Sequence, residues 1–150
     1  MNFFSGMKHL LPGIAAALFL AAAFSTPLRA QNPQSQEEKE KQEKQLLEYI
    51  DKEVQRLSAY LNLEYYQEFW VDSTLNHDLH AMREELEALQ ASKVSNPDFF
   101  VAVQDKWMQA IYDSYHRFLT EEQWKKYLKS GASREQKGRD KRRAAREEKN

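Results

Sequence analysis

The strongest candidate for chemistry in this chain is a pair of histidines followed by an acid: His77, His80 and Glu84. In an α-helix, residues three, four or seven apart share one face, so this spacing predicts one patch with two imidazoles and a carboxylate. Zn²⁺ and Ni²⁺ accept both ligand types, and such a patch would hold either ion weakly. A structural zinc site needs four ligands, however, and no catalytic base accompanies these residues. A solvated histidine face is the competing interpretation.

The sequence contains no other arrangement typical of an active site. It has no cysteine, which excludes disulfides and thiolate metal ligands. The serines follow no nucleophile motif, and no Gly-rich phosphate loop is present. The carboxylates are numerous, but their helical spacing with Lys and Arg is typical of surface ion pairs. We therefore expect a protein that is not an enzyme and needs no cofactor.

The spacing of apolar residues predicts an all-α fold, because no stretch alternates apolar and polar residues with period two. A first amphipathic helix is expected up to residue 61, and Asn62 is a plausible N-cap or break. A second, long helix follows over about 63–93. The stripes expected to be buried are Leu47, Ile50, Val54, Leu57 and Leu61 on the first helix, and Leu75, Leu79, Met82, Leu86 and Leu89 on the second.

Two capping signals predict the remaining helices. Asn96 before Pro97 and Asp98 is a strong helix start, since proline suits the first helical position and an acid suits the first turn. The apolar face of this third helix is expected to hold Phe100, Val103, Trp107, Ile111 and Phe118. A capping box from Thr120 to Gln123 then begins a short fourth helix, about 121–130, with Gly131 after it. The architecture expected is a long-helix hairpin plus a third helix and a short fourth helix.

The first thirty residues have the pattern of a secretory signal peptide. Lys8 is followed by a mostly apolar run over 10–24, and Ala30 is a small residue at the expected cleavage point. A run of about 15 residues is short for a membrane span, although an uncleaved anchor is the alternative. We expect a periplasmic or secreted protein that begins near Gln31 after cleavage.

Composition divides the rest of the chain into three parts. Residues 31–45 form a polar segment, 46–131 the helical domain, and 132–150 a basic tail without large apolar residues. The domain is acidic, which argues against nucleic-acid binding. The tail is expected to be disordered and solvated. Contact between the tail and an anionic membrane surface is the alternative.

The start of the long helix is unusually aromatic. Tyr65, Tyr66, Phe69 and Trp70 lie there, and together with Leu63 and Val71 their side chains would cover most of the helix circumference. A helix that is apolar all round must be covered on several sides. Either the chain's own helices cover it, or a client protein or second copy does. These four residues are therefore the candidate partner-binding residues.

A short motif occurs twice in the helical domain. Leu119, Thr120 and Gln123 form an LTxxQ signature, and Leu63 and Gln67 belong to a looser copy in which Glu64 replaces the threonine. In this motif the chain resembles the CpxP/Spy-like family of small periplasmic helical proteins. The resemblance implies a long-helix hairpin, usually in an antiparallel homodimer with a concave face. It also implies ATP-independent chaperoning, modulation of envelope-stress signalling and, in some members, a zinc response.

These observations predict a non-enzymatic, periplasmic or secreted helical binding protein. Its expected partner is a client protein or a second copy of the chain, and nucleic acid is not expected. Chaperone activity or modulation of envelope stress is what the family resemblance adds. The alternatives are a metal-responsive protein that uses the histidine patch, and a structural envelope protein.

Overall fold

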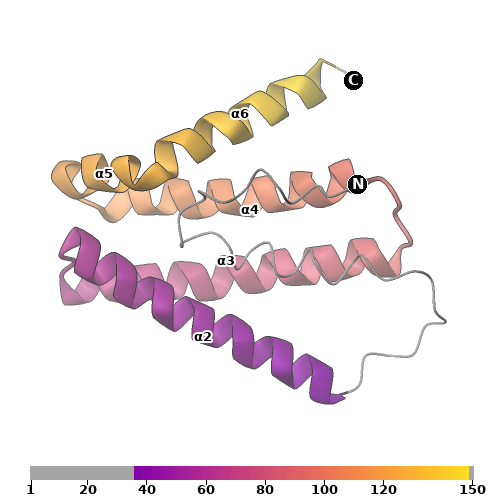
Figure 1. Ribbon diagram of the computed structural model, residues 1–150, viewed down its shortest axis with the longest axis horizontal. Coiled ribbons are helices and arrows are strands. Elements are labelled where there is room, and N and C mark those ends of the chain that lie inside the picture. The colour runs from indigo at the N-terminus through magenta and orange to yellow at the C-terminus, as the bar shows by residue number, and fades with distance from the viewer. Residues whose placement is uncertain (1–35, 149–150) are drawn as a thin grey trace, which may run out of the picture. The chain divides into compact units, whose positions relative to one another are not determined.

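The computed structural model describes residues 36–148, and every regular element in this range is helical (Figure 1). The elements are α2 (Gln36–Leu61), α3 (Tyr65–Ala91), α4 (Pro97–Phe118), α5 (Glu121–Tyr127), η1 (Leu128–Ala132) and α6 (Ser133–Glu147). The predicted all-α class is confirmed. The expected signal peptide, its cleavage point and the start of the polar segment lie outside the described residues. The chain divides after Gln45, and the contacts below belong to the unit that begins at Leu46.

Local sequence explains where α2 ends and where α4 begins. Asn62 has a φ of 54°, in the left-handed region that asparagine tolerates better than most residues, and α2 ends at the residue before it. Asn62 is thus a break, and the residue at the N-cap of α3 is Glu64. At the start of α4, the Asn96 side chain accepts a hydrogen bond from the backbone N of Asp98 at 2.9 Å. The capping signal around Pro97 is confirmed.

The long hairpin is formed by α3 and α4, which pack closely against each other (Figure 1). Their inward faces follow the helical period and supply most of the core. The buried apolar residues are Ile50, Leu57 and Leu61 of α2; Val71, Leu75, Leu79, Met82 and Leu86 of α3; Val103, Ile111 and Tyr115 of α4; and Leu119 and Ala132.

Six residues expected on buried stripes are not fully buried; besides Leu47 and Trp107, these are the half-buried Val54, Leu89, Phe100 and Phe118. Leu47 is exposed on α2. Trp107 is half-buried on α4, and its indole Nε1 donates to Glu85 Oε2 at 2.8 Å. Lys106 Nζ lies 2.7 Å from the same carboxylate oxygen. Trp107 therefore occupies a polar border of the α3–α4 contact, where its N–H finds a partner that the apolar core would not offer.

The segment expected to be a disordered tail differs from the prediction over most of its length, because Ser133–Glu147 forms α6. Gly131 has a φ of 108°, which suits glycine, and the chain bends there within the wide turn η1. The helix then resumes and runs beside α4 (Figure 1). None of the helices in the described range is both long and apolar enough to cross a membrane.

Candidate functional site

The candidate partner-binding residues form an exposed aromatic patch on the first turns of α3. We use the term aromatic patch for Tyr65, Tyr66, Phe69 and Trp70, whose exposed fractions are 88%, 51%, 60% and 51%. The rings of Phe69 and Trp70 contact each other edge to face, with centroids 5.8 Å apart. Side chains of this kind are usually buried, so four of them together on the surface mark a candidate interaction site.

The helical period explains why these rings point outward. Gln67, Val71 and Leu75 recur every four residues and are buried. They take the inward face of α3, which leaves the intervening aromatic positions on the outer side. The interpretation that the chain's own helices cover the patch is therefore wrong for the described residues. Tyr60, near the end of α2, is itself partly exposed, and its hydroxyl donates to the carbonyl oxygen of Lys126 at 3.1 Å.

The two copies of the motif meet directly beneath this end of α3. Gln67 Nε2 donates to Gln123 Oε1 at 2.7 Å, and Gln123 Nε2 donates back to Gln67 Oε1 at 2.9 Å. Each glutamine also caps its own helix. Gln67 Oε1 accepts from the backbone N of Glu64 at 3.0 Å, and Gln123 Oε1 accepts from the backbone N of Thr120 at 2.9 Å. The second capping box is completed by Thr120 Oγ1, which accepts from the backbone N of Gln123 at 3.3 Å.

The second amide hydrogen of each glutamine is donated to a backbone carbonyl near the other motif copy. Gln67 Nε2 donates to the carbonyl of Phe118 at 3.1 Å, and Gln123 Nε2 donates to the carbonyl of Asn62 at 3.4 Å. Asn62 and Phe118 are separated by the same interval as the two glutamines. All donors and acceptors of both side-chain amides are thus used, and Gln67 is only 1% exposed. This glutamine pair fixes the start of α3, and with it the backbone that carries the aromatic patch.

The other two motif residues, Leu63 and Leu119, each come directly before the N-cap residue of the helix that follows. Leu119 is buried and Leu63 is half-buried. The sequence singled out all the residues of both copies, but it gave no indication that the copies touch. Contact between residues so far apart in the chain depends on how α3, α4 and α5 pack, which a local pattern does not specify.

The predicted metal ligands are not brought together. His77 and Glu84 are exposed and His80 is half-buried. His77 Nδ1 lies 2.7 Å from Asp78 Oδ1, and His80 Nδ1 lies 2.6 Å from the carbonyl oxygen of Asn76. Among residues 36–148, no group of three or more His, Cys, Asp or Glu side chains is placed to hold a metal ion. The geometry therefore does not support a metal centre on α3.

A second aromatic group, which we call the packed cluster, lies where α4 meets α5. Its members are Tyr112, Tyr115, Trp124 and Tyr127, with ring centroids 4.8 Å apart for Tyr112 and Trp124, and 5.4 Å apart for Tyr115 and Tyr127 and for Trp124 and Tyr127. The ring of His116 contacts that of Trp124, with centroids 4.4 Å apart, but His116 is exposed rather than half-buried as its place beside Tyr112 and Tyr115 suggested. Burial raises the pKa of Tyr115 and of Tyr127, so both phenols stay neutral. The Tyr115 hydroxyl is buried without a hydrogen-bond partner among the described residues.

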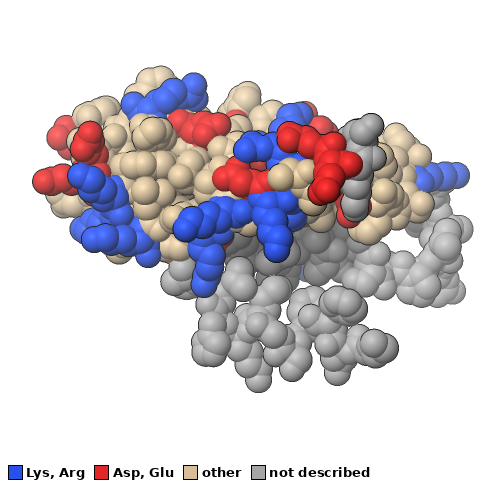
Figure 2. Space-filling view, turned by 90° about the horizontal axis from the view of Figure 1, so that it is seen from above, with Lys and Arg blue, Asp and Glu red and all other residues tan. Residues whose placement is uncertain are grey.

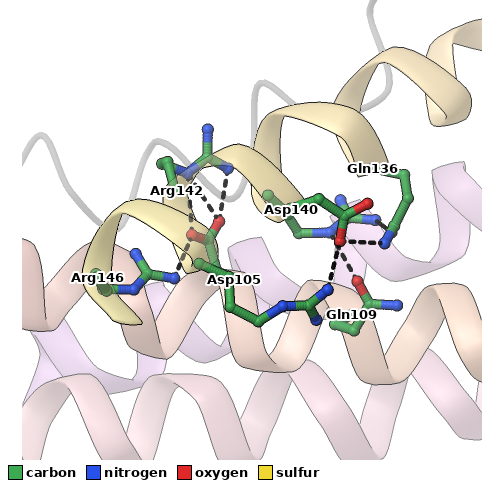
Figure 3. A network of polar contacts seen from close by, with 8 residues as sticks. Asp105, Gln109, Gln136, Asp140, Arg142 and Arg146 are labelled. Carbon is green, nitrogen blue, oxygen red and sulfur yellow. Dashed lines mark hydrogen bonds and ion pairs between the residues drawn. The ribbon is translucent and has the colours of Figure 1, made fainter. Parts of the chain in front are cut away.

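Helix α6 is held on α4 by charge, as Figure 3 shows. Arg142 donates to both carboxylate oxygens of Asp105, from Nη2 at 2.6 Å and from Nε at 2.9 Å, and Arg146 Nη2 donates at 3.0 Å. Burial alone would raise the pKa of Asp105, but the hydrogen bonds from the two guanidinium groups hold this pKa below its usual value. The sequence reasoning missed this contact. The signal was present, since Arg142 and Arg146 are four residues apart and share one helical face.

A third arginine contacts α4 one turn earlier. Arg139 is buried, its Nη2 donates to Gln136 Oε1 at 2.6 Å, and its guanidinium lies 5.4 Å from the ring centroid of Tyr112. The outer side of this part of the molecule shows Lys and Arg interspersed with Asp and Glu rather than a continuous basic surface (Figure 2). The arginines that face α4 are engaged within the protein. This arrangement weakens the alternative that residues 132–150 serve as a free basic tail for membranes.

Comparison with known proteins identifies no relative: no family model, no curated protein and no solved structure matches the chain. The resemblance to LTxxQ proteins therefore stays a prediction, and the function has to be argued from the aromatic patch and its surroundings.

Proposed function

We propose that this protein is a non-enzymatic helical binding protein that works in the periplasm or outside the cell, and that its aromatic patch holds a client polypeptide. The observation that carries the proposal is the exposure of four large aromatic side chains on a rigidly capped helix. Aromatic rings provide much contact area at a low entropic cost, and they are enriched among the residues that dominate protein interfaces.

The glutamine pair supports this role by holding the patch in a defined geometry. A surface that is already ordered loses less conformational entropy on binding than a flexible loop would. The charged residues on the turns that carry the patch are the carboxylates Glu64, Glu68 and Asp72. Binding through apolar contact, without ATP, is the activity that this surface favours.

The test is suppression of client aggregation in the absence of ATP. A chemically unfolded client diluted into buffer should aggregate less when the protein is present, as measured by light scattering. The double variant Tyr66→Ser/Phe69→Ser should lose most of this protection, because each lost aromatic anchor is worth about 2 kcal/mol at an interface. Protection that is unchanged in this variant would contradict the proposal.

A matched control removes the same kind of surface elsewhere. Leu47 and Phe99 are exposed to 46% and 55%, close to the values for Tyr66 and Phe69, but they lie outside the patch. Leu47→Ser/Phe99→Ser should protect the client as the wild type does. Sedimentation of all three proteins distinguishes a client site from a contact between two copies. If the patch variant is monomeric while the wild type is a dimer, the patch joins two copies and the client proposal fails.

The proposed location has its own test. Protein isolated from the native host should begin at Gln31, because the small residue Ala30 ends the expected signal peptide. N-terminal sequencing measures this directly. A chain that still begins at Met1 in fractionated cells would contradict secretion.

A further inference from the structure

We infer that the client recognised by the aromatic patch is a segment that is both apolar and positively charged. This inference rests on the proposed function, and it follows from the charges around the patch. Between Arg56 and Arg83 the chain contains no Lys or Arg, whereas Glu64, Glu68 and Asp72 lie on the same turns as the aromatic rings. The charged residues on the turns of α3 that carry the patch are therefore all acidic.

The helical spacing places these acids beside the rings. Glu68 follows Tyr65 by three residues and Asp72 follows Phe69 by three, and side chains at this spacing are neighbours on a helix surface. Asp72 is exposed. Glu68 is half-buried and accepts a hydrogen bond from the Ser58 hydroxyl of α2. One edge of the patch is thus lined by carboxylates that a bound Lys or Arg could reach.

The aromatic rings themselves favour a cation. The faces of Trp, and less strongly of Tyr and Phe, attract ammonium and guanidinium groups. The protein uses such contacts internally, since Lys126 Nζ lies 5.5 Å from the ring centroid of Tyr60 and Lys106 Nζ lies 4.7 Å from that of Trp107. Trp70, half exposed in the patch, offers an equivalent ring to a partner.

The same charges disfavour the other possible occupants. Two copies joined through the patch with antiparallel α3 helices would bring the acidic edge of one copy towards the same edge of the other, and like charges across an interface are costly. An anionic lipid surface would be repelled for the same reason. A polypeptide segment with apolar residues flanked by Lys or Arg matches both properties of the surface.

The test compares three fluorescent peptides with the same Leu- and Phe-containing centre, flanked by Lys, by Ser or by Glu. Their affinities for the purified protein are measured by fluorescence anisotropy. At about 20 mM salt the Lys-flanked peptide should bind roughly tenfold more tightly than the Glu-flanked one, and the ratio should approach one near 500 mM salt because screening shortens the reach of the charges.

Two variants assign the effect to the patch. Glu64→Gln/Glu68→Gln/Asp72→Asn should reduce the tenfold ratio to less than about threefold, while its affinity for the Ser-flanked peptide changes by less than about twofold. The control Glu84→Gln/Glu87→Gln/Asp98→Asn removes as many acids at the far end of the hairpin and should keep the wild-type ratio. Circular dichroism confirms that each variant is folded, and the single variant Asp72→Asn, at an exposed position, should reproduce part of the loss.

The outcomes separate the two proposals. If the wild type binds none of the three peptides, the proposed binding function fails. If it binds all three equally at low salt, the binding function stands and the preference for a cationic client is overturned. A ratio that the control variant reduces as much as the patch variant would also overturn the inference, because the effect would then come from overall charge.

Discussion

The aromatic patch and the packed cluster use the same residue types at the same end of the α3–α4 hairpin, yet one faces out and the other faces in. The patch exposes half or more of each side chain, whereas Tyr115 of the packed cluster is 2% exposed. The difference arises from which residues occupy the inward face of each helix. In the first turns of α3 the inward positions are taken by Gln67 and Val71, so the rings are left outside. On α4 the rings themselves take the inward positions and are covered by α5. The aromatic content of a helix therefore indicates a binding surface only when it is known which face of the helix is buried.

The largest effect on stability is expected from a substitution in the packed cluster. Tyr115→Ala should lower the free energy of unfolding by about 3–5 kcal/mol, because it removes a large ring from the core and leaves a cavity. Urea denaturation followed by circular dichroism measures this loss. A variant as stable as the wild type would show that the packed cluster does not support the fold.

A smaller loss of stability is expected at the contact between α4 and α6, which lies next to the packed cluster. Asp105→Asn should cost about 2 kcal/mol, because hydrogen bonds to a charged group are lost between α4 and α6. The pKa of Asp105 is lower in the folded protein than in the unfolded chain, so the folded state is stabilised at pH values above the unfolded pKa of about 4. This stabilisation is lost as the pH falls through the folded value.

The measurement is a pair of thermal melts at pH 7 and near pH 3. The free energy of unfolding should differ widely between wild type and Asp105→Asn at pH 7, and this difference should narrow near pH 3, because the carboxyl of the unfolded chain takes up a proton below its pKa of about 4. Lys106→Gln, whose Nζ contacts Glu85 at the surface, serves as a control that leaves α6 in place. A gap that is the same at both pH values would contradict the role of the Asp105 charge.

Tyr115→Phe is expected to raise the stability of the protein, in contrast to Tyr115→Ala. It keeps the ring but removes a hydroxyl that is buried without a hydrogen-bond partner among the described residues. We expect a gain of about 1 kcal/mol, since an unpaired buried polar group is costly. Paired urea denaturation curves for Tyr115→Phe and the wild type would show it. A loss of stability would mean that the hydroxyl makes a contact that compensates for its burial.

The smallest expected effect is on the exposed side. Tyr66→Ser/Phe69→Ser should change the free energy of unfolding by no more than about 0.5 kcal/mol per residue, as is usual for surface positions. Circular dichroism melts measure the change. A collapse of the melting temperature would show that the patch belongs to the core, and loss of client binding in this variant would then carry no information.

The sequence was most informative where structure is decided locally. The start of α4 at Asn96–Pro97 and the capping box from Thr120 to Gln123 depend on hydrogen bonds between residues two or three apart, and both were predicted correctly. The apolar period of α3 likewise placed Leu75, Leu79 and Met82 in the core.

Features that depend on the packing of distant helices were predicted less well. Residues 133–147 have no large apolar side chain, so their pattern indicated a disordered tail. Their helix is instead held by a carboxylate on α4 that only the folded structure brings near Arg142 and Arg146. The histidine patch shows that a local pattern can also suggest a site that the fold does not form. His77, His80 and Glu84 have a spacing that suits metal ligands, but their side chains are not brought together. The four candidate binding residues were named from the sequence, but their exposure was not decided by it.

The glutamine pair makes two helix starts into one cooperative unit. Each side chain closes the first turn of its own helix and also holds the other side chain, so neither turn can fray without leaving the partner amide unpaired. The backbone amides in the first turns of α3 and α5 should therefore exchange their hydrogens with solvent at similar rates, although more than fifty residues separate them along the chain. In Gln67→Ala, exchange should quicken at the start of α5 as well as at the start of α3.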